Sequence, residues 1–280
     1  GELNVLVKDA MTAELAPDGS KVGYEREGDL FVYDLNSETE TQLTDSGKEN
    51  FYNGRFGWVY EEEFGLAQAW SWSHDSQYIA YWQTDERHVK LFESTDYSGT
   101  YPEYVEIPYP KVGEENPHIK IGVVNVENGE NTWLDMDLKD GYIPRLYWTA
   151  RPGTLATVWL NRPQNHLKLH FYDVESGSGQ LIMEEKNETG WIDVFDFFAG
   201  VDHYFTFPEN HEEFFWVSER DGFNHIYRYD YSGKLINQVT DGDWEVTKIH
   251  AINPDSEYIY YNSTEVSALE RHLYSIKFDG

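Results

Sequence analysis

The sequence predicts an all-β protein built from repeated antiparallel sheets, and three observations lead to this prediction. Aromatic residues are 16% of the 280 residues and are rich in Tyr and Trp, which suit pleated strands better than helical bundles. Helical periodicity is scarce, whereas short apolar or alternating runs between turn residues are common. Units that begin with Gly and a nearby aromatic residue recur at about 50 residues, a period typical of four-stranded propeller blades.

Two local patterns predict where strands begin and end. In the first, a turn of the type x-Pro-Asp-Gly/Ser leads into a run of Tyr, Ile and Val, as in residues 16–24, 73–81 and 253–261. The Asp and the Gly or Ser set the turn, and the residues that follow favour a strand. In the second, an aromatic strand ends in Asp and a polar turn, as in residues 29–35, 168–174, 225–231 and 272–278.

The starts of the larger units are marked by Gly57, Gly141, Gly190 and Gly242. The last two intervals are 49 (190 − 141) and 52 (242 − 190) residues, which is one blade each. The first interval is 84 (141 − 57) residues and predicts a blade that carries an insertion at about residues 86–117. The prolines of this insertion exclude a central strand but allow an extended arm of two strands.

We therefore expect residues 1–280 to form a single β-propeller domain of four-stranded antiparallel blades. The count is about five blades plus part of another, so we expect an incomplete ring whose sheet edges are left open. A β-sandwich or a solenoid is the alternative, and the length, similarity and aromatic content of the units argue against it.

Composition excludes several classes of function. The net charge of −30 argues against nucleic-acid partners, which need a basic surface. The absence of cysteine removes disulfides, thiolate catalysis and cysteine metal sites, and it leaves the compartment open. No apolar run is long enough for a membrane helix, and no signal-peptide pattern is visible at the first residues. A soluble protein is expected, and a periplasmic or secreted location in a bacterium is compatible with this composition.

The segment Gly57–Gly65 is the most informative in the chain. Three carboxylates, Glu61, Glu62 and Glu63, stand among Trp58, Tyr60 and Phe64, which we expect to desolvate them in part. On a short helical turn, adjacent glutamates point about 100° apart and could converge on one ammonium group. In a chain with 51 Asp and Glu, a solvated acidic run is the alternative.

The wider pattern resembles the N-terminal β-propeller of dipeptidyl peptidase IV and its relatives in the prolyl oligopeptidase family of serine peptidases. The resemblance runs in order along nearly the whole chain. It is carried by residues 58–63, 70–73, 101–111, 116–117, 190–191, 218–222 with 225–227, and 242–245.

The resemblance implies roles for particular residues. Glu62 and Glu63 correspond to the pair that binds the free α-amino group of a peptide substrate, and Glu61 to a structural acid before them. Phe195 corresponds to an aromatic residue that lines the substrate pocket, with a core phenylalanine as the alternative reading. Asp196 stands where some relatives carry a basic side chain. The resemblance also implies release of N-terminal dipeptides, preferentially after proline, and a homodimer to which the 86–117 arm contributes.

The sequence contains no Gly-x-Ser-x-Gly nucleophile elbow. In the family, the catalytic residues lie in a C-terminal α/β-hydrolase domain, so we expect no catalytic residue in this chain and no activity from it alone. A free-standing propeller that serves as a protein-interaction scaffold is the alternative function. A propeller glycosidase is less favoured, because its two acids must face each other from separate strands.

No cofactor or metal site is expected from the sequence. Residues 135–141 are similar to an EF-hand loop, but Lys139 takes the third ligand position and favours a polar turn. The ten histidines include neither His-x-His nor His-Glu-x-x-His, which argues against a histidine metal site.

Overall fold

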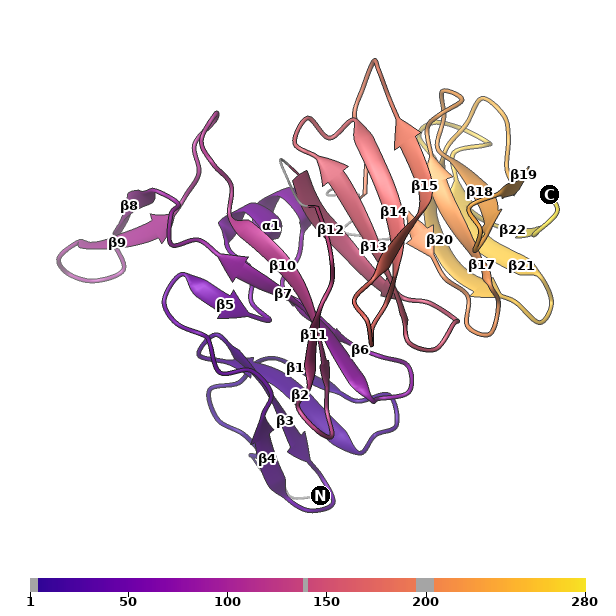
Figure 1. The fold of residues 1–280 in the computed structure, drawn as a ribbon. Coiled ribbons are helices and arrows are strands. Elements are labelled where there is room, and N and C mark those ends of the chain that lie inside the picture. Colours follow the sequence, from indigo (N-terminus) through magenta and orange to yellow (C-terminus); the bar gives the residue numbers. More distant parts are fainter. Residues whose placement is uncertain (1–4, 138–140, 195–203) are drawn as a thin grey trace. The chain divides into compact units, whose positions relative to one another are not determined.

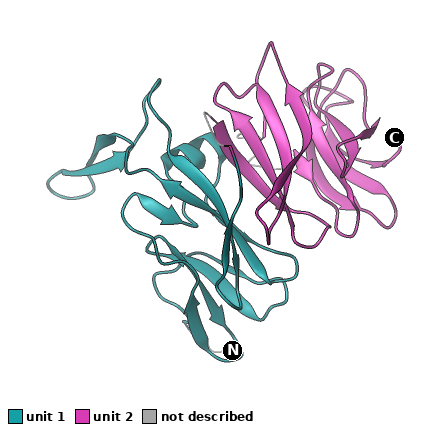
Figure 2. Cartoon of the chain, in the orientation of Figure 1, with its two compact units in different colours: residues 1–136 teal, residues 137–280 magenta. Residues whose placement is uncertain are grey.

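The chain divides into two compact units, Gly1–Met136 and Asp137–Gly280 (Figure 2). The computed structural model describes residues 5–137, 141–194 and 204–280. Regular structure in these residues is almost entirely β-strand, with one short helix, α1, Trp58–Phe64 (Figure 1). No helix in this part of the chain has the length and apolar character needed to span a membrane. The prediction of an all-β protein is confirmed.

Over residues 5–136, the first unit contains two blade-like antiparallel sheets. Their strands are β1 Met11–Leu15, β2 Lys21–Arg26, β3 Asp29–Asp34, β4 Thr39–Gln42, β5 Phe51–Asn53, β6 Trp70–Trp72, β7 Tyr78–Asp85, β10 His118–Asn125 and β11 Asn131–Trp133. The first sheet has the order β1-β2-β3-β4, so each strand pairs with its neighbour in sequence. The second has the order β11-β10-β7-β5, and β6 also pairs with β7.

Between β7 and β10 the chain forms a separate two-stranded antiparallel sheet of β8, Leu91–Asp96, and β9, Glu103–Pro108. This arm extends away from the second sheet (Figure 1). It lies inside the predicted insertion at residues 86–117, and its two strands have the predicted form. Most side chains of both strands are exposed, so the arm is held at its base rather than by a core of its own.

In its described residues, the second unit contains three sheets whose strands pair in chain order. Its strands are β12 Gly141–Trp148, β13 Thr154–Asn161, β14 His166–Asp173, β15 Gly179–Lys186, β16 Phe205–Thr206, β17 Glu213–Ser218, β18 His225–Asp230, β19 Leu235–Gln238, β20 Val246–Asn253, β21 Tyr258–Ser263 and β22 His272–Lys277. The first two sheets have four strands each, β12 to β15 and β16 to β19. In the described residues the third sheet has three, β20 to β22.

The predicted turns form as the sequence patterns require. Asp18 accepts a hydrogen bond from the Ser20 N–H at 2.8 Å, and Gly19 has the positive φ of 72° that closes the turn before β2. Asp75 accepts from the Gln77 N–H at 3.0 Å in the turn before β7. The aromatic segments predicted to end in Asp are β3, β14, β18 and β22, each the third strand of its sheet.

The core of the first unit lies between its two sheets. Leu30 from β3 and Ile79 from β7 are completely buried, and they share one apolar cluster with Trp70 and Trp72 of β6. The Trp70 indole donates a hydrogen bond to the Thr12 hydroxyl at 3.0 Å, which ties β6 to the first sheet. Burial of this cluster holds the second sheet, and with it α1 and the arm, against the first.

Leu30→Ala should lower the free energy of unfolding by about 2 to 5 kcal/mol, because the substitution leaves a cavity in a packed cluster. Leu91→Ala is the matched control. Leu91 is 51% exposed on the arm, so its truncation should cost about 0.5 kcal/mol or less. Urea unfolding followed by tryptophan fluorescence would measure both, since Trp70 and Trp72 lie in the same cluster as Leu30. Equal costs for the two variants would contradict this assignment of the core.

Candidate functional site

The acidic triplet lies on a short helix bounded by two glycines. Gly57 is the N-cap of α1 in an extended conformation, and Gly65 ends the helix with a φ of 62° and a ψ of 34°. The Gly65 N–H donates to the carbonyl of Tyr60, as in a left-handed helix C-cap. A residue with a side chain would be strained at this φ, so Gly65 defines where the helix stops.

Aromatic packing against its buried side holds α1 in place. Val59, Tyr60 and Phe64 are buried. The ring of Tyr60 stacks on Phe56 with centroids 5.3 Å apart, and Phe56 meets the edge of Trp82 on β7 at 5.0 Å. The helix is therefore fixed to β7 by a continuous series of aromatic contacts rather than by its own seven residues, which are too few to be stable alone.

Glu61, Glu62 and Glu63 occupy the outward side of α1, and all three are exposed. The expectation that aromatic neighbours desolvate them is wrong, because Tyr60 and Phe64 turn to the buried side of the same helix. Within the described ranges, the structure gives the three carboxylates no hydrogen-bond or ion-pair partner. The result is a packed helix that presents three adjacent anionic groups, which favours binding of a cation.

A fourth acid, Glu86, lies beside Gly57, the N-cap residue of α1. It follows β7 and is only 3% exposed. Its carboxyl occupies the space beside Gly57 where a side chain at that position would lie, so a Cβ on residue 57 would collide with it. Its Oε1 has no hydrogen-bond partner among the described residues, and burial raises the pKa of Glu86 to about 7. Sequence reasoning missed Glu86, because Asp85-Glu86-Arg87 has the composition of an ordinary polar turn.

The second unit contains a cavity of about 410 Å³ beside Trp191, which is 68% exposed. Its walls include Glu185, Trp216 and Arg220. The guanidinium of Arg220 is 2.5 Å from Glu185, and it lies 4.1 Å from the centroid of the Tyr227 ring. The sequence motifs 190–191 and 218–222 thus border one cavity, which local patterns could not predict.

Two predictions lie wholly or partly outside the described residues. Phe195, the expected pocket aromatic, and its neighbour Asp196 fall in the segment 195–203, which the structure does not describe. The loop at 135–141 that is similar to an EF-hand includes residues 138–140, which are also outside the described part of the chain. The pocket role of Phe195 remains a prediction.

Comparison with known proteins agrees with this architecture. The family described as "Dipeptidyl peptidase IV (DPP IV) N-terminal region" matches residues 2–280. The "Probable dipeptidyl peptidase 4" of Aspergillus flavus is 29% identical over 283 residues, which covers 96% of this chain and 36% of that protein. The "Dipeptidyl peptidase 4" of Trichophyton tonsurans is 29% identical over 282 residues, covering 97% and 36%.

A solved structure shows the same similarity. The crystal structure of Porphyromonas gingivalis dipeptidyl peptidase 4 superposes with a TM-score of 0.88 at 33% identity, over 97% of this chain and 38% of that one. The chain therefore spans little more than a third of the length of the relatives it matches.

Successive antiparallel sheets of three to five strands, paired largely in chain order, define an all-β protein of the propeller-blade class. Within that class the chain belongs to the dipeptidyl peptidase IV N-terminal region family.

The buried Glu86 generates a prediction about pH. Its pKa is about 7 in the folded chain against an ordinary value of 4.5, so the folded state keeps a proton that the unfolded state loses between these values. The contribution of this bound proton to the free energy of unfolding is complete below about pH 4.5 and is lost as the pH rises to about 7. Glu86→Gln removes this titration, so its stability relative to the wild type should increase by about 3 kcal/mol across that range.

Urea unfolding of both proteins at a series of pH values from acid to neutral would measure the difference. Other acids titrate equally in the two proteins, so their contributions cancel in the comparison. Stability curves that stay parallel over the whole range would show that Glu86 is ionised in the folded chain.

Proposed function

We propose that this chain is the substrate-gating and substrate-anchoring part of a serine-type dipeptidyl peptidase that releases N-terminal dipeptides, preferentially after proline. Glu62 and Glu63 bind the free α-amino group of the peptide. The nucleophile belongs to an α/β-hydrolase domain that follows in the same protein, and this chain is not catalytic by itself. The observation that carries the proposal is an exposed acidic triplet on an anchored helix, in a chain of the dipeptidyl peptidase IV N-terminal family.

The chemistry of the two partners supports this role. An α-ammonium group has three donors and a full positive charge, and charge-assisted hydrogen bonds to carboxylates are among the strongest in proteins. Two adjacent glutamates can accept from it at once. Since Tyr60 and Phe64 fix the helix, a bound N-terminus would be held at a constant position. A fixed N-terminus determines which peptide bond reaches the nucleophile, and this limits the enzyme to dipeptide release.

In the intact protein, Glu62→Gln or Glu63→Gln should lower kcat/KM for dipeptide substrates with a free amine by about two to three orders of magnitude. An amide has no net charge to offer the substrate ammonium. Glu61→Gln is the matched control, because Glu61 lies on the same helix, is also exposed and has no direct substrate contact in this proposal. Steady-state kinetics with a chromogenic dipeptide substrate would measure all three variants.

The reactive serine should remain accessible in these variants, so labelling by a small serine-directed phosphonate should not change. Substrates with a blocked amine should be poor for the wild type and nearly indifferent to the substitutions. Wild-type efficiency of both Gln variants on free-amine substrates would mean that the triplet is only a charged surface, and the proposed function would be wrong.

We also propose that the intact protein is a homodimer and that the β8–β9 arm contributes to its interface. The arm exposes an unusual number of large apolar and aromatic side chains for a solvated hairpin. They are Leu91, Phe92, Tyr97, Tyr101, Tyr104 and Val105. A second copy that covers them would remove this surface from water.

Replacing residues 91–108 of the intact protein by a short Gly-Ser linker should weaken dimerisation while the sheets stay folded. The linker can be short, because the Tyr109 N–H already donates to the Lys90 carbonyl at 3.0 Å and closes the base of the arm. Phe92→Ser with Val105→Ser is a second variant that keeps the arm. Sedimentation velocity should show a shift towards monomer for both, and an unchanged dimer would assign the arm another role.

A further inference from the structure

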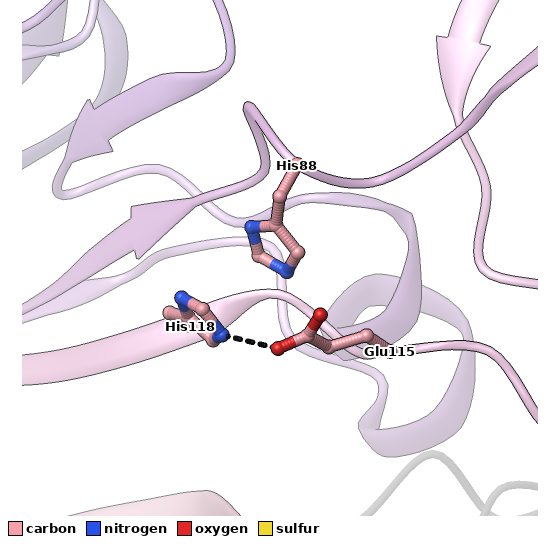
Figure 3. A group of neighbouring side chains, drawn as sticks. All are labelled: His88, Glu115 and His118. Atoms are coloured by element: carbon pink, nitrogen blue, oxygen red, sulfur yellow. Dashed lines mark hydrogen bonds and ion pairs between the residues drawn. The ribbon is translucent and has the colours of Figure 1, made fainter.

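Three potential metal ligands meet at the base of the arm. His88 lies between β7 and β8, Glu115 lies between β9 and β10, and His118 begins β10 (Figure 3). We call the segments before β8 and after β9 the two stems of the arm. Each stem contributes one side chain to the group, and β10 contributes the third. The sequence did not reveal this group. His88 is 27 residues (115 − 88) before Glu115, and Glu115 and His118 form only a Glu-x-x-His pattern, which is neither His-x-His nor His-Glu-x-x-His.

The geometry of the group suits a small divalent ion. One ligand atom from each of the three residues lies within 4.8 Å of the others. The Nε2 atom of His118 is 2.8 Å from Glu115 Oε1, and the two imidazole rings stack with centroids 4.0 Å apart. In a tetrahedral zinc site with bonds of about 2.0 to 2.2 Å, neighbouring ligand atoms are roughly 3.3 Å apart. The two rings are inclined by only 21°, and a ligated ion lies in the plane of each imidazole, so one ring must rotate for the three atoms to surround one ion.

The electrostatic surroundings also favour a cation. The neighbouring basic residues Arg87 and Lys90 are each paired with a carboxylate, Arg87 with Asp85 at 2.6 Å and Lys90 with Glu114. The chain as a whole carries a net charge of −30, which attracts cations.

We propose that His88, Glu115 and His118 form a binding site for a first-row divalent transition metal ion of the zinc type. Two imidazole nitrogens and one carboxylate oxygen are the ligand set of known three-residue zinc sites, and the fourth position is open to water or an outside donor. All three side chains are exposed, so the ion exchanges with solvent. Its structural effect is to join the two stems of the arm to β10. The proposal does not depend on the function proposed for Glu62 and Glu63.

The 280-residue chain, prepared without a histidine tag and stripped with a chelator, should bind Zn²⁺ at one ion per chain in calorimetric titration. His88→Ala and His118→Ala should abolish this binding, and Glu115→Gln should weaken it more than about tenfold through loss of the charged ligand. His272→Ala is the matched control. His272 forms an exposed pair with Glu270 at 2.6 Å, and this pair lies outside the described three-residue cluster.

A second readout locates the ion. Co²⁺ should give the visible absorption of a low-coordinate site in the wild type and in His272→Ala, but not in His118→Ala. Bound Zn²⁺ should also slow tryptic cleavage after Lys90 and Lys111, which flank the arm. Stoichiometry and affinity that are unchanged in His88→Ala and His118→Ala would overturn the site, as would a wild type that binds no Zn²⁺. Tryptic cleavage after Lys90 and Lys111 that is equally fast with and without saturating Zn²⁺ would overturn the role of the ion in joining the stems.

Discussion

The aromatic contact between Phe56 and Trp82 is the interaction on which the described site depends. Trp82 belongs to β7, and Phe56 stacks on Tyr60 of α1, so the helix is bound to the sheet through these two rings. Without this contact, a seven-residue helix would have too few internal hydrogen bonds to persist. The position of the acidic triplet is therefore a property of the core of the first unit.

The end of β7 connects this contact to the other features of the first unit. The Thr84 hydroxyl donates to the Arg55 carbonyl at 3.0 Å and so orders the segment that leads into α1. Glu86 then fills the space beside Gly57, and His88 contributes to the group at the base of the arm. One strand end thus positions a helix, a buried carboxyl and a cluster of possible metal ligands within a few residues.

The fold determines which of the many acidic residues are paired and which are available to a ligand. Many carboxylates are paired: Glu25 with Arg55 at 2.8 Å, and Glu213 with Arg228 at 2.7 Å. These pairs link neighbouring strands or the segments beside them. Glu62 and Glu63 differ because they lie on an anchored helix with no partner in the described residues, where their charge is available to a ligand. Composition predicts the surplus of negative charge, whereas the fold determines which part of it is free.

The sequence by itself determined the local features: the turns at residues 16–24 and 73–81, the strands that follow them, and the insertion that forms β8 and β9. These follow from the conformational preferences of adjacent residues, which act over a few positions. It also determined that three glutamates are adjacent, whereas the helix that carries them is a finding of the structure.

Only the tertiary structure decided that Tyr60 and Phe64 face inward and leave these glutamates exposed, and that Glu86 lies against Gly57. It alone brought His88 to Glu115 and His118. Such contacts join residues that are distant in sequence, and no local preference encodes them. They arise when burial of the apolar cores of the sheets fixes the strand ends in space.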